Sequence, residues 1–293
     1  MAPLTLMAVH AHPDDEAIST GGILARYAAE GVQTVLVTCT RGEVGEIVDP
    51  SVADPDNLAD VRDAELRAAC ALLRVSALHV LGYRDSGMMD TPDNDDPRSF
   101  WRADLDEATG RLVALIRRYQ PQVLVTYDAN GFYGHPDHIQ AHRVAVAAFD
   151  AAGDPARYPE QGLAPWAPQK LYYTTVPRSA MATFAQRLRE AGLESPLPED
   201  AAEITWGSPD DEVTTAVDVR EYAMLKREAL ATHRSQVGPE TFFLMLSPEL
   251  WREMMGVEHF CRAVSRVPLP PPPANGDAVG READLFAGLR AEA

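Results

Sequence analysis

The sequence His10-Ala11-His12-Pro13-Asp14-Asp15-Glu16 directly follows an apolar run over residues 4–9. An apolar run of this length indicates a strand that is buried on both faces of a sheet. The polar stretch therefore lies at the carboxyl end of that strand, where open α/β sheets place their functional sites. Its two imidazoles and three carboxylates include suitable ligands for a divalent metal ion, with one carboxylate left for proton transfer.

A second polar cluster, Tyr133-Gly134-His135-Pro136-Asp137-His138, follows the apolar residues 123–126 in the same way. The carboxyl ends of parallel strands meet at one edge of a sheet, so the two clusters can share one ion. The alternative is that each cluster is a solvated loop in which Pro13 or Pro136 starts a helix. The presence of both clusters at equivalent points of the chain favours a shared metal site.

Between these clusters the chain alternates between predicted helices and strands. Helical spacing of apolar residues, with Gly31 as the C-terminal cap, predicts a helix over residues 18–29, and residues 32–39 form the next strand. A strand, a helix and a strand in this order form a βαβ unit with parallel strands. The same periodicities predict helices over residues 60–73, 105–119 and 136–148 and strands over residues 78–81 and 123–126.

Two further loops follow predicted strand ends, over residues 40–60 and 82–88. The first is long enough for a functional role to be considered. This loop carries the charged residues Arg41, Glu43 and Glu46. We nevertheless expect their side chains to be solvated rather than to line a site. The second loop is expected to reach the same sheet edge as the two polar clusters.

Beyond residue 150 the alternation persists with less regular spacing, with strands predicted over residues 171–176 and 213–219 and helices over residues 179–191 and 221–233. The expected fold class is α/β. We expect a Rossmann-like, mostly parallel sheet flanked by helices in residues 1–170 and a smaller mixed α/β part in residues 171–293 that caps its open edge. Five prolines within residues 267–273 predict a stiff tether to the terminal segment, residues 282–289.

The composition disfavours several classes of function. A formal net charge of −18 repels nucleic acid and anionic membrane surfaces, so a small neutral or cationic substrate is expected. The three cysteines are odd in number and lack CxxC spacing, which predicts buried thiols rather than disulfides. No apolar stretch reaches the ~20 residues of a membrane span, and residues 4–9 are too short for the core of a signal peptide, so we expect a cytoplasmic location. The sequence leaves open whether the chain forms a homo-oligomer.

The two polar clusters also carry a family resemblance. The sequence A-H-P-D-D-E at residues 11–16, together with H-P-D-H at residues 135–138, resembles the PIG-L/LmbE-like family of zinc-dependent N-deacetylases. Within it, the chain is similar to the mycothiol-pathway members, the acetylglucosaminyl-inositol deacetylases and the mycothiol S-conjugate amidases. The likeness covers most of residues 4–175 and returns weakly at the C-terminus. It implies hydrolysis of an N-acetyl amide in a small amino-sugar substrate.

Carried over residue by residue, the resemblance makes His12, Asp15 and His138 the metal ligands. Two imidazoles and one carboxylate leave a coordination position open for water, as a catalytic Zn²⁺ ion requires. The same ligand set also suits Fe²⁺. Hydrolysis is favoured over oxygen chemistry because the sequence shows no second cofactor pocket.

The resemblance also assigns roles in proton transfer. Asp14 stands at the position of the general base, for which the alternative is an N-cap of the following helix. His135 matches a protonated imidazole that stabilises the oxyanion or the leaving amine, and Asp137 matches the carboxylate that orients it. Tyr133 matches a tyrosine whose hydroxyl faces the oxyanion.

Substrate binding is assigned by resemblance to Arg62 and Asp85, which stand where the sugar deacetylases hold hydroxyl groups. Ser19 occupies a position where the S-conjugate amidases carry a lysine and the sugar deacetylases a serine. The expected function is therefore deacetylation of an acetylglucosaminyl-inositol, with the S-conjugate amidase and a non-catalytic metal-site binding module as alternatives. Of the other histidines, we expect packing or a loop hydrogen bond for His10, support of the metal site from His142, and surface or structural positions for His79, His233 and His259.

Overall fold

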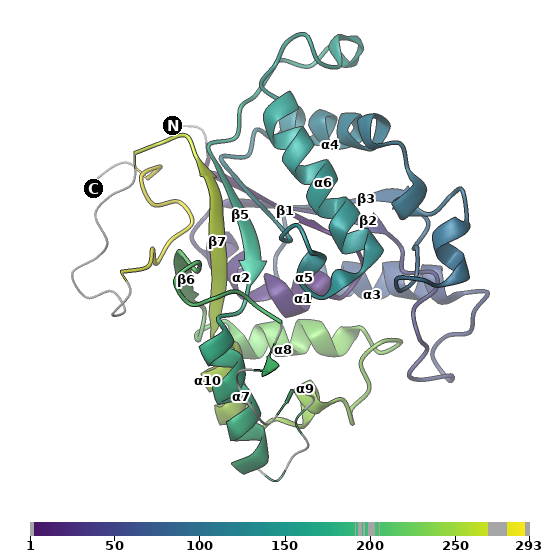
Figure 1. Ribbon diagram of the computed structural model, residues 1–293, viewed down its shortest axis with the longest axis vertical. Helices are drawn as coiled ribbons and strands as arrows, with labels where there is room; N and C mark the ends of the chain where they lie inside the picture. Colours follow the sequence, from purple (N-terminus) through teal and green to yellow (C-terminus); the bar gives the residue numbers. More distant parts are fainter. Residues whose placement is uncertain are drawn as a thin grey trace.

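The computed structural model describes residues 3–190, 206–268 and 280–290, together with residues 192, 195, 197, 198, 203 and 204. Its centre is a seven-stranded sheet in the order β3-β2-β1-β4-β5-β7-β6 (Figure 1). Strands β1 to β5 are parallel to one another, whereas β7 is antiparallel to both β5 and β6. The predicted mostly parallel α/β sheet is confirmed. The strands are β1 (Thr5–His10), β2 (Gln33–Thr40), β3 (Ala77–Tyr83), β4 (Val123–Thr126), β5 (Lys170–Thr175), β6 (Thr215–Asp218) and β7 (Val257–Ser265).

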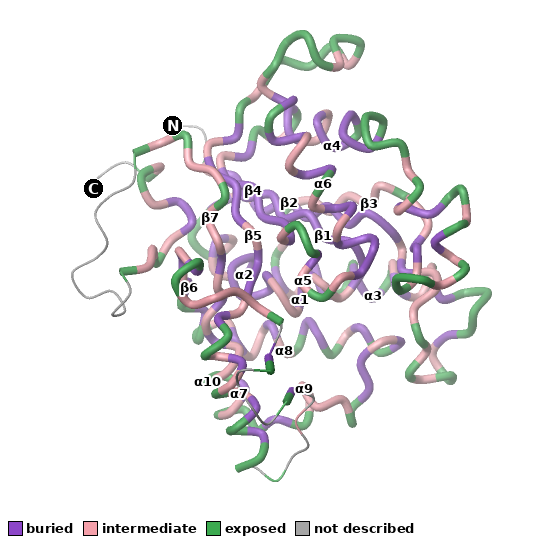
Figure 2. Tube along the Cα trace, viewed as in Figure 1, coloured by how far each residue is buried: buried purple, intermediate pink, exposed green. Residues whose placement is uncertain are grey.

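Helices cover both faces of the sheet (Figure 1). Side chains alternate across β1, so Leu6 and Ala8 pack in one core with α2, α3 and α8, while Met7 and Val9 pack in a second core with α4 and α6. Figure 2 shows the central strands buried and the outer loops exposed. The α-helices are α1 (Asp15–Ser19), α2 (Gly21–Ala29), α3 (Leu58–Leu72), α4 (Leu105–Tyr119), α5 (Gly131–Gly134), α6 (Pro136–Ala151), α7 (Arg178–Glu190), α8 (Ala223–Thr232), α9 (Phe242–Met245) and α10 (Pro248–Met255).

The helix predicted over residues 18–29 is instead two helices, α1 and α2, that meet at Thr20. The Thr20 hydroxyl hydrogen-bonds with His10 Nε2 at 2.8 Å. The first backbone N–H groups of α2 are satisfied by Glu258 of β7, which accepts hydrogen bonds from Gly22 (2.8 Å) and Ile23 (2.9 Å). Helix N-termini need such acceptors, and here the acceptor comes from a strand that the sequence did not reveal.

The sheet continues across residue 170, because β5 pairs with β4 on one side and with β7 on the other. The division of the chain at this residue into a catalytic part and a capping part stays a prediction. The proline-rich residues 269–273 lie outside the described residues. The segment after them docks on the sheet, where Leu285 and Phe286 are fully buried and Lys170 Nζ donates to Glu282 Oε1 at 3.0 Å.

Two expectations from composition can be compared with the structure. Cys39 and Cys70 are buried and Cys261 is half-buried, and all three are free thiols, as predicted. Among the described residues, none of the helices has the length and apolar character needed to cross a membrane.

Candidate active site

The first motif forms a tight turn after β1. The His12 backbone N–H donates to Asp15 Oδ2 at 2.8 Å, which folds the loop onto the start of α1. Asp14 lies between them with φ 105° and ψ −30°, a backbone conformation that a side-chain-bearing residue rarely adopts. Asp14 precedes α1, but its side chain makes no capping hydrogen bond, so the N-cap alternative does not apply.

The second motif forms the start of α6. His135 is the N-cap, and its Nδ1 accepts a hydrogen bond from the Asp137 backbone N–H at 3.1 Å. Pro136 occupies the first turn, where a missing N–H costs nothing. Gly131 has φ 63°, and a Cβ at this position would lie 2.6 Å from the Cβ of His138. Only glycine therefore allows the preceding turn to pass this close to α6.

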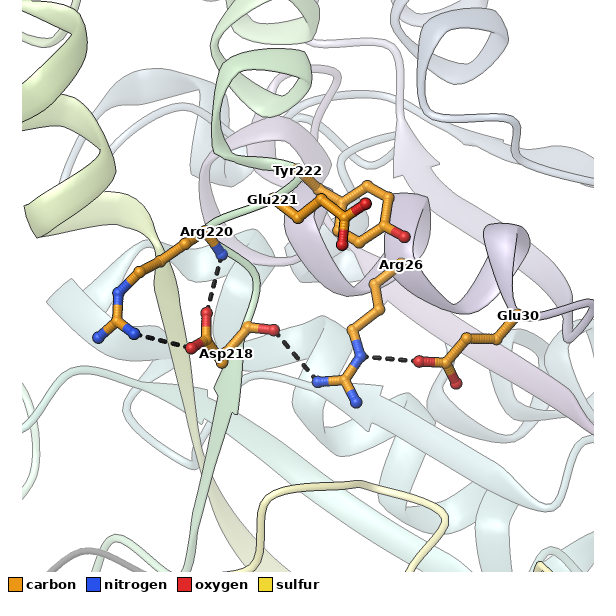
Figure 3. Close-up of a pocket in the computed structure, with 6 residues that line it drawn as sticks. All are labelled: Arg26, Glu30, Asp218, Arg220, Glu221 and Tyr222. Atoms are coloured by element: carbon orange, nitrogen blue, oxygen red, sulfur yellow. Dashed lines mark hydrogen bonds and ion pairs between the residues drawn. The ribbon is translucent and has the colours of Figure 1, made fainter.

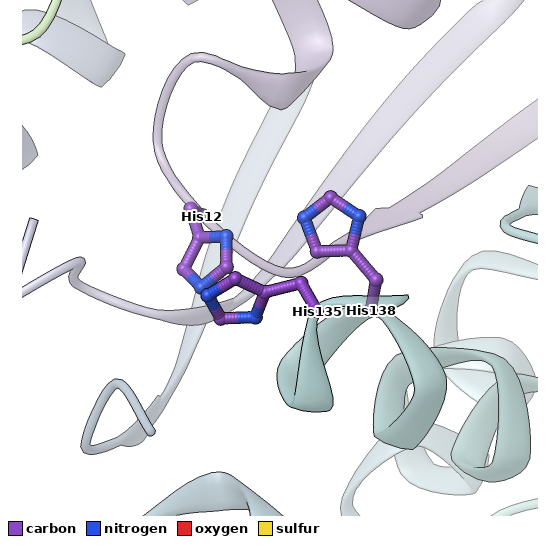
Figure 4. Close-up of side chains that lie close together, drawn as sticks. All are labelled: His12, His135 and His138. Atoms are coloured by element: carbon purple, nitrogen blue, oxygen red, sulfur yellow. The ribbon is translucent and has the colours of Figure 1, made fainter. Parts of the chain in front are cut away.

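The two motifs meet at the carboxyl edge of β1 and β4. His12, His135 and His138 can each place one ring nitrogen within 4.8 Å of the other two (Figure 4). Asp15 lies between two of them, with Oδ2 at 3.4 Å from His12 Nδ1 and Oδ1 at 3.5 Å from His138 Nε2. The structure thus brings together the three ligands that the resemblance implies, with His135 beside them.

The donor set fits a divalent metal ion. His138 is 2% exposed, and neither of its ring nitrogens has a hydrogen-bond partner. Buried polar groups without partners are rare, so this imidazole is well suited to bind a metal ion. Burial disfavours the charged form of His12. Three nearby carboxylates outweigh burial and raise the pKa of His12 well above its usual value, and these are Asp85, Asp137 and Asp15. A cluster with this excess of negative charge can hold a cation.

Asp137 has different partners from those predicted. Its carboxylate accepts hydrogen bonds from the Ser86 backbone N–H at 2.9 Å and from the Ser86 hydroxyl, and it lies 3.1 Å from His12 Nε2. The contact predicted between the Asp137 carboxylate and His135 is made by the Asp137 backbone N–H instead. Asp137 therefore orients His12, and Ser86, which sequence reasoning missed, holds Asp137.

Asp85 lies at the site, as predicted, with Oδ1 3.6 Å from His12 Nε2. Its backbone N–H donates to Glu43 Oε2 at 3.0 Å. The expectation that Glu43 is a solvated loop charge is therefore wrong, because this carboxylate is used to anchor the Asp85 loop. Arg41 and Glu46 conform better to that expectation, since Arg41 pairs at the surface with Asp60 and Glu46 is exposed.

Arg62 reaches the site from α3 and is 3% exposed. Its Nη2 donates to the Pro13 carbonyl at 2.6 Å and to Asp14 Oδ2 at 3.1 Å, and its Nη1 donates to the Gly42 carbonyl at 3.0 Å. Its described hydrogen bonds thus hold the Asp14 turn, and its predicted contact with substrate hydroxyls stays a prediction. Burial raises the pKa of Asp14 to about 6, although Arg62 opposes this shift. A carboxyl with such a pKa can exchange a proton near neutral pH.

His135 is buried in the cluster, whereas Tyr133 beside it is exposed. Burial, together with the charges of His12 and His138, lowers the pKa of His135 to about 3. These surroundings disfavour the protonated form that the resemblance implies for His135. The Tyr133 ring is 42% exposed, with its centroid 5.0 Å from that of His138. Ser19 is half-buried at the end of α1, and its part in substrate binding stays a prediction.

Two of the remaining histidines surround Tyr127, whose ring stacks on His138 with 4.1 Å between centroids. His10 is fully buried and its Nδ1 lies 3.2 Å from the Tyr127 hydroxyl. His142 Nδ1 bonds the Tyr127 carbonyl at 2.9 Å, so it supports His138 only through Tyr127. His233 is a buried structural residue, and its Nε2 donates to Glu16 Oε1 at 2.7 Å. No sequence signal connected His233 with Glu16.

A separate surface hollow of about 560 Å³ is lined by none of these residues (Figure 3). Four of its charged side chains form two ion pairs: Arg26 Nε lies 2.8 Å from Glu30 Oε1, and Arg220 Nη1 lies 2.7 Å from Asp218 Oδ2. The cluster of histidines and carboxylates, rather than this hollow, is the candidate active site. The hollow is lined by Arg26, Glu30, Asp218, Arg220, Glu221 and Tyr222.

Comparison with known structures shows the fold. The N,N′-diacetylchitobiose deacetylase of Pyrococcus horikoshii matches with a TM-score of 0.62 and 20% identity, over 89% of this chain and 84% of that one. The 4-carboxy-2-hydroxymuconate hydratase of Pseudomonas putida matches with a TM-score of 0.60 and 20% identity, over 91% and 99% of the two chains. Because one is a deacetylase and the other a hydratase, the fold alone does not define the reaction.

Sequence comparison is more specific. Residues 7–149 match the PIG-L family, described as GlcNAc-PI de-N-acetylase. The chain is 47% identical to the 1D-myo-inositol 2-acetamido-2-deoxy-alpha-D-glucopyranoside deacetylase of Geodermatophilus obscurus, over 97% of both chains. It is also 47% identical to deacetylase 1 of the same name from Catenulispora acidiphila, over 97% of this chain and 89% of that one. The resemblance in the two motifs is thereby confirmed, and the chain belongs to the PIG-L family.

Proposed function

We propose that this protein is a metal-dependent N-deacetylase that releases acetate from 1D-myo-inositol 2-acetamido-2-deoxy-α-D-glucopyranoside and leaves the free amino sugar. The observation that carries this proposal is the 47% identity, over 97% of the chain, to a relative of that name. The buried cluster that can hold a metal ion, with a carboxylate beside it, supplies the chemistry for amide hydrolysis. We also expect a cytoplasmic location.

The proposed metal is Zn²⁺, held by His12, Asp15 and His138, and Fe²⁺ also suits this set of ligands. When bound, the ion polarises the acetyl carbonyl and lowers the pKa of an attacking water towards ~7. His12 is held for this role by Asp137, and its backbone N–H in turn holds Asp15. Such supporting contacts orient ligands and tune their basicity.

The residues around the ion supply the proton transfers. Asp14 takes the proton of the attacking water, and with a pKa of about 6 it can return that proton to the departing amine. Because the Asp137 backbone N–H donates to His135 Nδ1, the neutral ring carries its proton on Nε2. His135 Nε2 and the Tyr133 hydroxyl then donate hydrogen bonds to the oxyanion that develops on the acetyl group.

Substrate hydroxyl groups are proposed to bind Asp85, with Ser19 and Arg62 completing the sugar subsite. Asp85 is oriented by hydrogen bonds at both its ends: its Oδ1 accepts from the Gly87 backbone N–H at 2.8 Å, and its own N–H donates to Glu43. A carboxylate held in this way presents its second oxygen in a defined direction. Deacetylation of a compact glycoside is favoured over cleavage of an S-conjugate because the relatives with high identity carry the deacetylase name.

The test is amine release from the acetylglucosaminyl-inositol by the protein loaded with Zn²⁺, followed with an amine-reactive fluorophore. A mycothiol S-conjugate is assayed in parallel, and Asp14→Asn serves as the control for background hydrolysis. We expect release from the acetylglucosaminyl-inositol at a higher kcat/KM. Preference for the S-conjugate would assign the amidase function, and binding of both compounds without release of amine would assign a binding module.

A further inference from the structure

Asp14 has a strained backbone that its surroundings must hold in place. Its φ of 105° with ψ of −30° is favourable for few residues other than glycine. Such strain persists only where neighbouring contacts over-determine the conformation. The position of the Asp14 carboxylate therefore depends on the groups that bind the Asp14 backbone.

Two groups hold this turn. Arg62 binds the Pro13 carbonyl and the Asp14 carboxylate. Glu16 Oε2 accepts a hydrogen bond from the Asp14 backbone N–H at 3.0 Å. Glu16 is fully buried, so the direction of its carboxylate is set by whatever binds its second oxygen.

That second oxygen, Oε1, accepts a hydrogen bond from His233 Nε2 at 2.7 Å. His233 follows α8, 217 residues further along the chain, and is itself fully buried. In a water-free environment, a carboxylate that lost this partner would be left partly unpaired and would turn towards any other donor. Its hold on the Asp14 N–H would then be lost or displaced.

We propose that His233 is a positioning residue that fixes the Asp14 turn through Glu16 and thereby aims the Asp14 carboxylate at the attacking water. This inference rests on the proposed function, in which Asp14 is the base. It also gives a role in the active site to a residue that follows α8. The general base is positioned by a side chain that lies 217 residues after Glu16 in the sequence. A displacement of a reacting group by about 1 Å is enough to lower turnover ~10²-fold.

The test uses the full-length protein loaded with Zn²⁺. His233→Leu removes the hydrogen-bond donor, and His233→Gln retains an N–H that can reach Glu16. We expect His233→Leu to lower kcat ~10–100-fold with KM within about twofold of wild type and metal content unchanged. His233→Gln should recover a substantial part of the lost kcat, whereas a residue that merely fills space would be replaced better by leucine.

The matched control is Lys170→Met, which also removes a buried cation paired with a carboxylate. Lys170 is the first residue of β5, at the edge of the sheet opposite the site. The Lys170→Met variant should be less stable than wild type, but its kcat per folded molecule should be unchanged. Glu16→Gln and the double variant Glu16→Gln/His233→Leu complete a double-mutant cycle. If His233 acts through Glu16, the fold-loss in kcat of the double variant should be smaller than the product of the two single losses.

A second readout is independent of turnover. Protection of the Asp14 amide from hydrogen exchange, measured by NMR, should be high in wild type, lower in His233→Leu and restored in His233→Gln. The inference is overturned if folded His233→Leu has wild-type kcat, if only KM changes, if the losses multiply, or if the Asp14 amide stays protected. A wild-type protein that protects this amide but releases no amine would instead overturn the proposed function.

Discussion

Asp15 Oδ1 lies 3.5 Å from His138 Nε2, and the two residues follow β1 and β4, which are neighbouring strands. His138 has no hydrogen-bond partner at either ring nitrogen. Its replacement would therefore remove a proposed ligand without breaking a hydrogen bond of the protein. The metal site can for this reason be tested separately from the fold.

We expect a chelator to abolish amine release and Zn²⁺ to restore it, and we expect His138→Ala to fold but to lose the metal. Metal content is measured by inductively coupled plasma mass spectrometry and folding by circular dichroism. His79→Ala is the control, because His79 bonds Tyr119 away from the cluster and its loss should leave the metal in place. Wild-type metal content in His138→Ala would show that this residue is not a ligand.

Asp14→Asn tests the base. The amide preserves an acceptor for Arg62 and leaves the three ligands untouched, so the metal should be retained. Turnover should fall ~10²–10⁴-fold because an amide cannot take a proton from water. Steady-state kinetics and metal analysis on the same sample check this result. Loss of the metal would make Asp14 a ligand, and unchanged turnover would exclude it as the base.

The pair His233–Glu16 predicts a pH dependence of stability. Burial lowers the pKa of His233, but Glu16, with further contributions from Asp14 and Glu65, outweighs burial and raises that pKa above the usual value of 6.5. The folded state thus binds the proton more tightly than the unfolded state does. The stabilisation is full below pH ~6.5 and is lost as the pH rises through the higher pKa of the folded state.

The measurement is the free energy of unfolding in urea for wild type and His233→Gln between pH ~5.5 and ~9. The difference between the two proteins should be largest at the acidic end and shrink as the pH rises. Titrating groups far from His233 contribute equally to both proteins and cancel in the difference. A difference that is constant or that grows with pH would contradict the predicted direction of the shift.

Lys170 predicts how firmly the terminal segment is docked. Its buried Nζ donates to Glu282 and to the carbonyls of Leu285 (3.2 Å) and Ala287 (3.0 Å). Lys170→Met removes this donor, but Glu282 Oε2 still lies 2.7 Å from Arg262 Nη1. Because the Glu282 charge stays paired, we expect a loss of about 1–3 kcal/mol in the free energy of unfolding. Urea unfolding checks this value. A loss below about 1 kcal/mol would mean that the apolar contacts of Leu285 and Phe286 hold the segment by themselves.

Ser19 tests the choice between the two mycothiol-pathway substrates. The resemblance places a lysine at this position in the S-conjugate amidases and a serine in the sugar deacetylases. Ser19→Lys adds a cation at the end of α1 and should narrow the preference for the acetylglucosaminyl-inositol. The measurement is the ratio of kcat/KM for the two substrates in wild type and variant, and a ratio that does not change would remove Ser19 from the specificity residues.

The sequence by itself predicted the parallel part of the sheet and the meeting of the two polar clusters. Apolar runs such as residues 4–9 and 123–126 identify buried strands, because a strand covered on both faces needs apolar side chains throughout. Parallel strands end at one edge, so the polar residues after each of them had to meet there. The two polar clusters could be placed together for this reason, and the family resemblance then implies His12, Asp15 and His138 as the ligands within them. Strand β7 escaped prediction, since Glu258, His259 and Arg262 interrupt its apolar pattern.

Only the tertiary structure decided the partners of the buried polar groups. The Asp137 carboxylate binds Ser86 and His12 rather than His135, Arg62 holds the Asp14 turn, and His233 binds Glu16. Periodicity reports which side of an element is buried, but it carries no information on which distant side chain lies opposite. A buried carboxylate takes whichever donor the packing of distant segments brings within about 3 Å, and that is a property of the assembled fold.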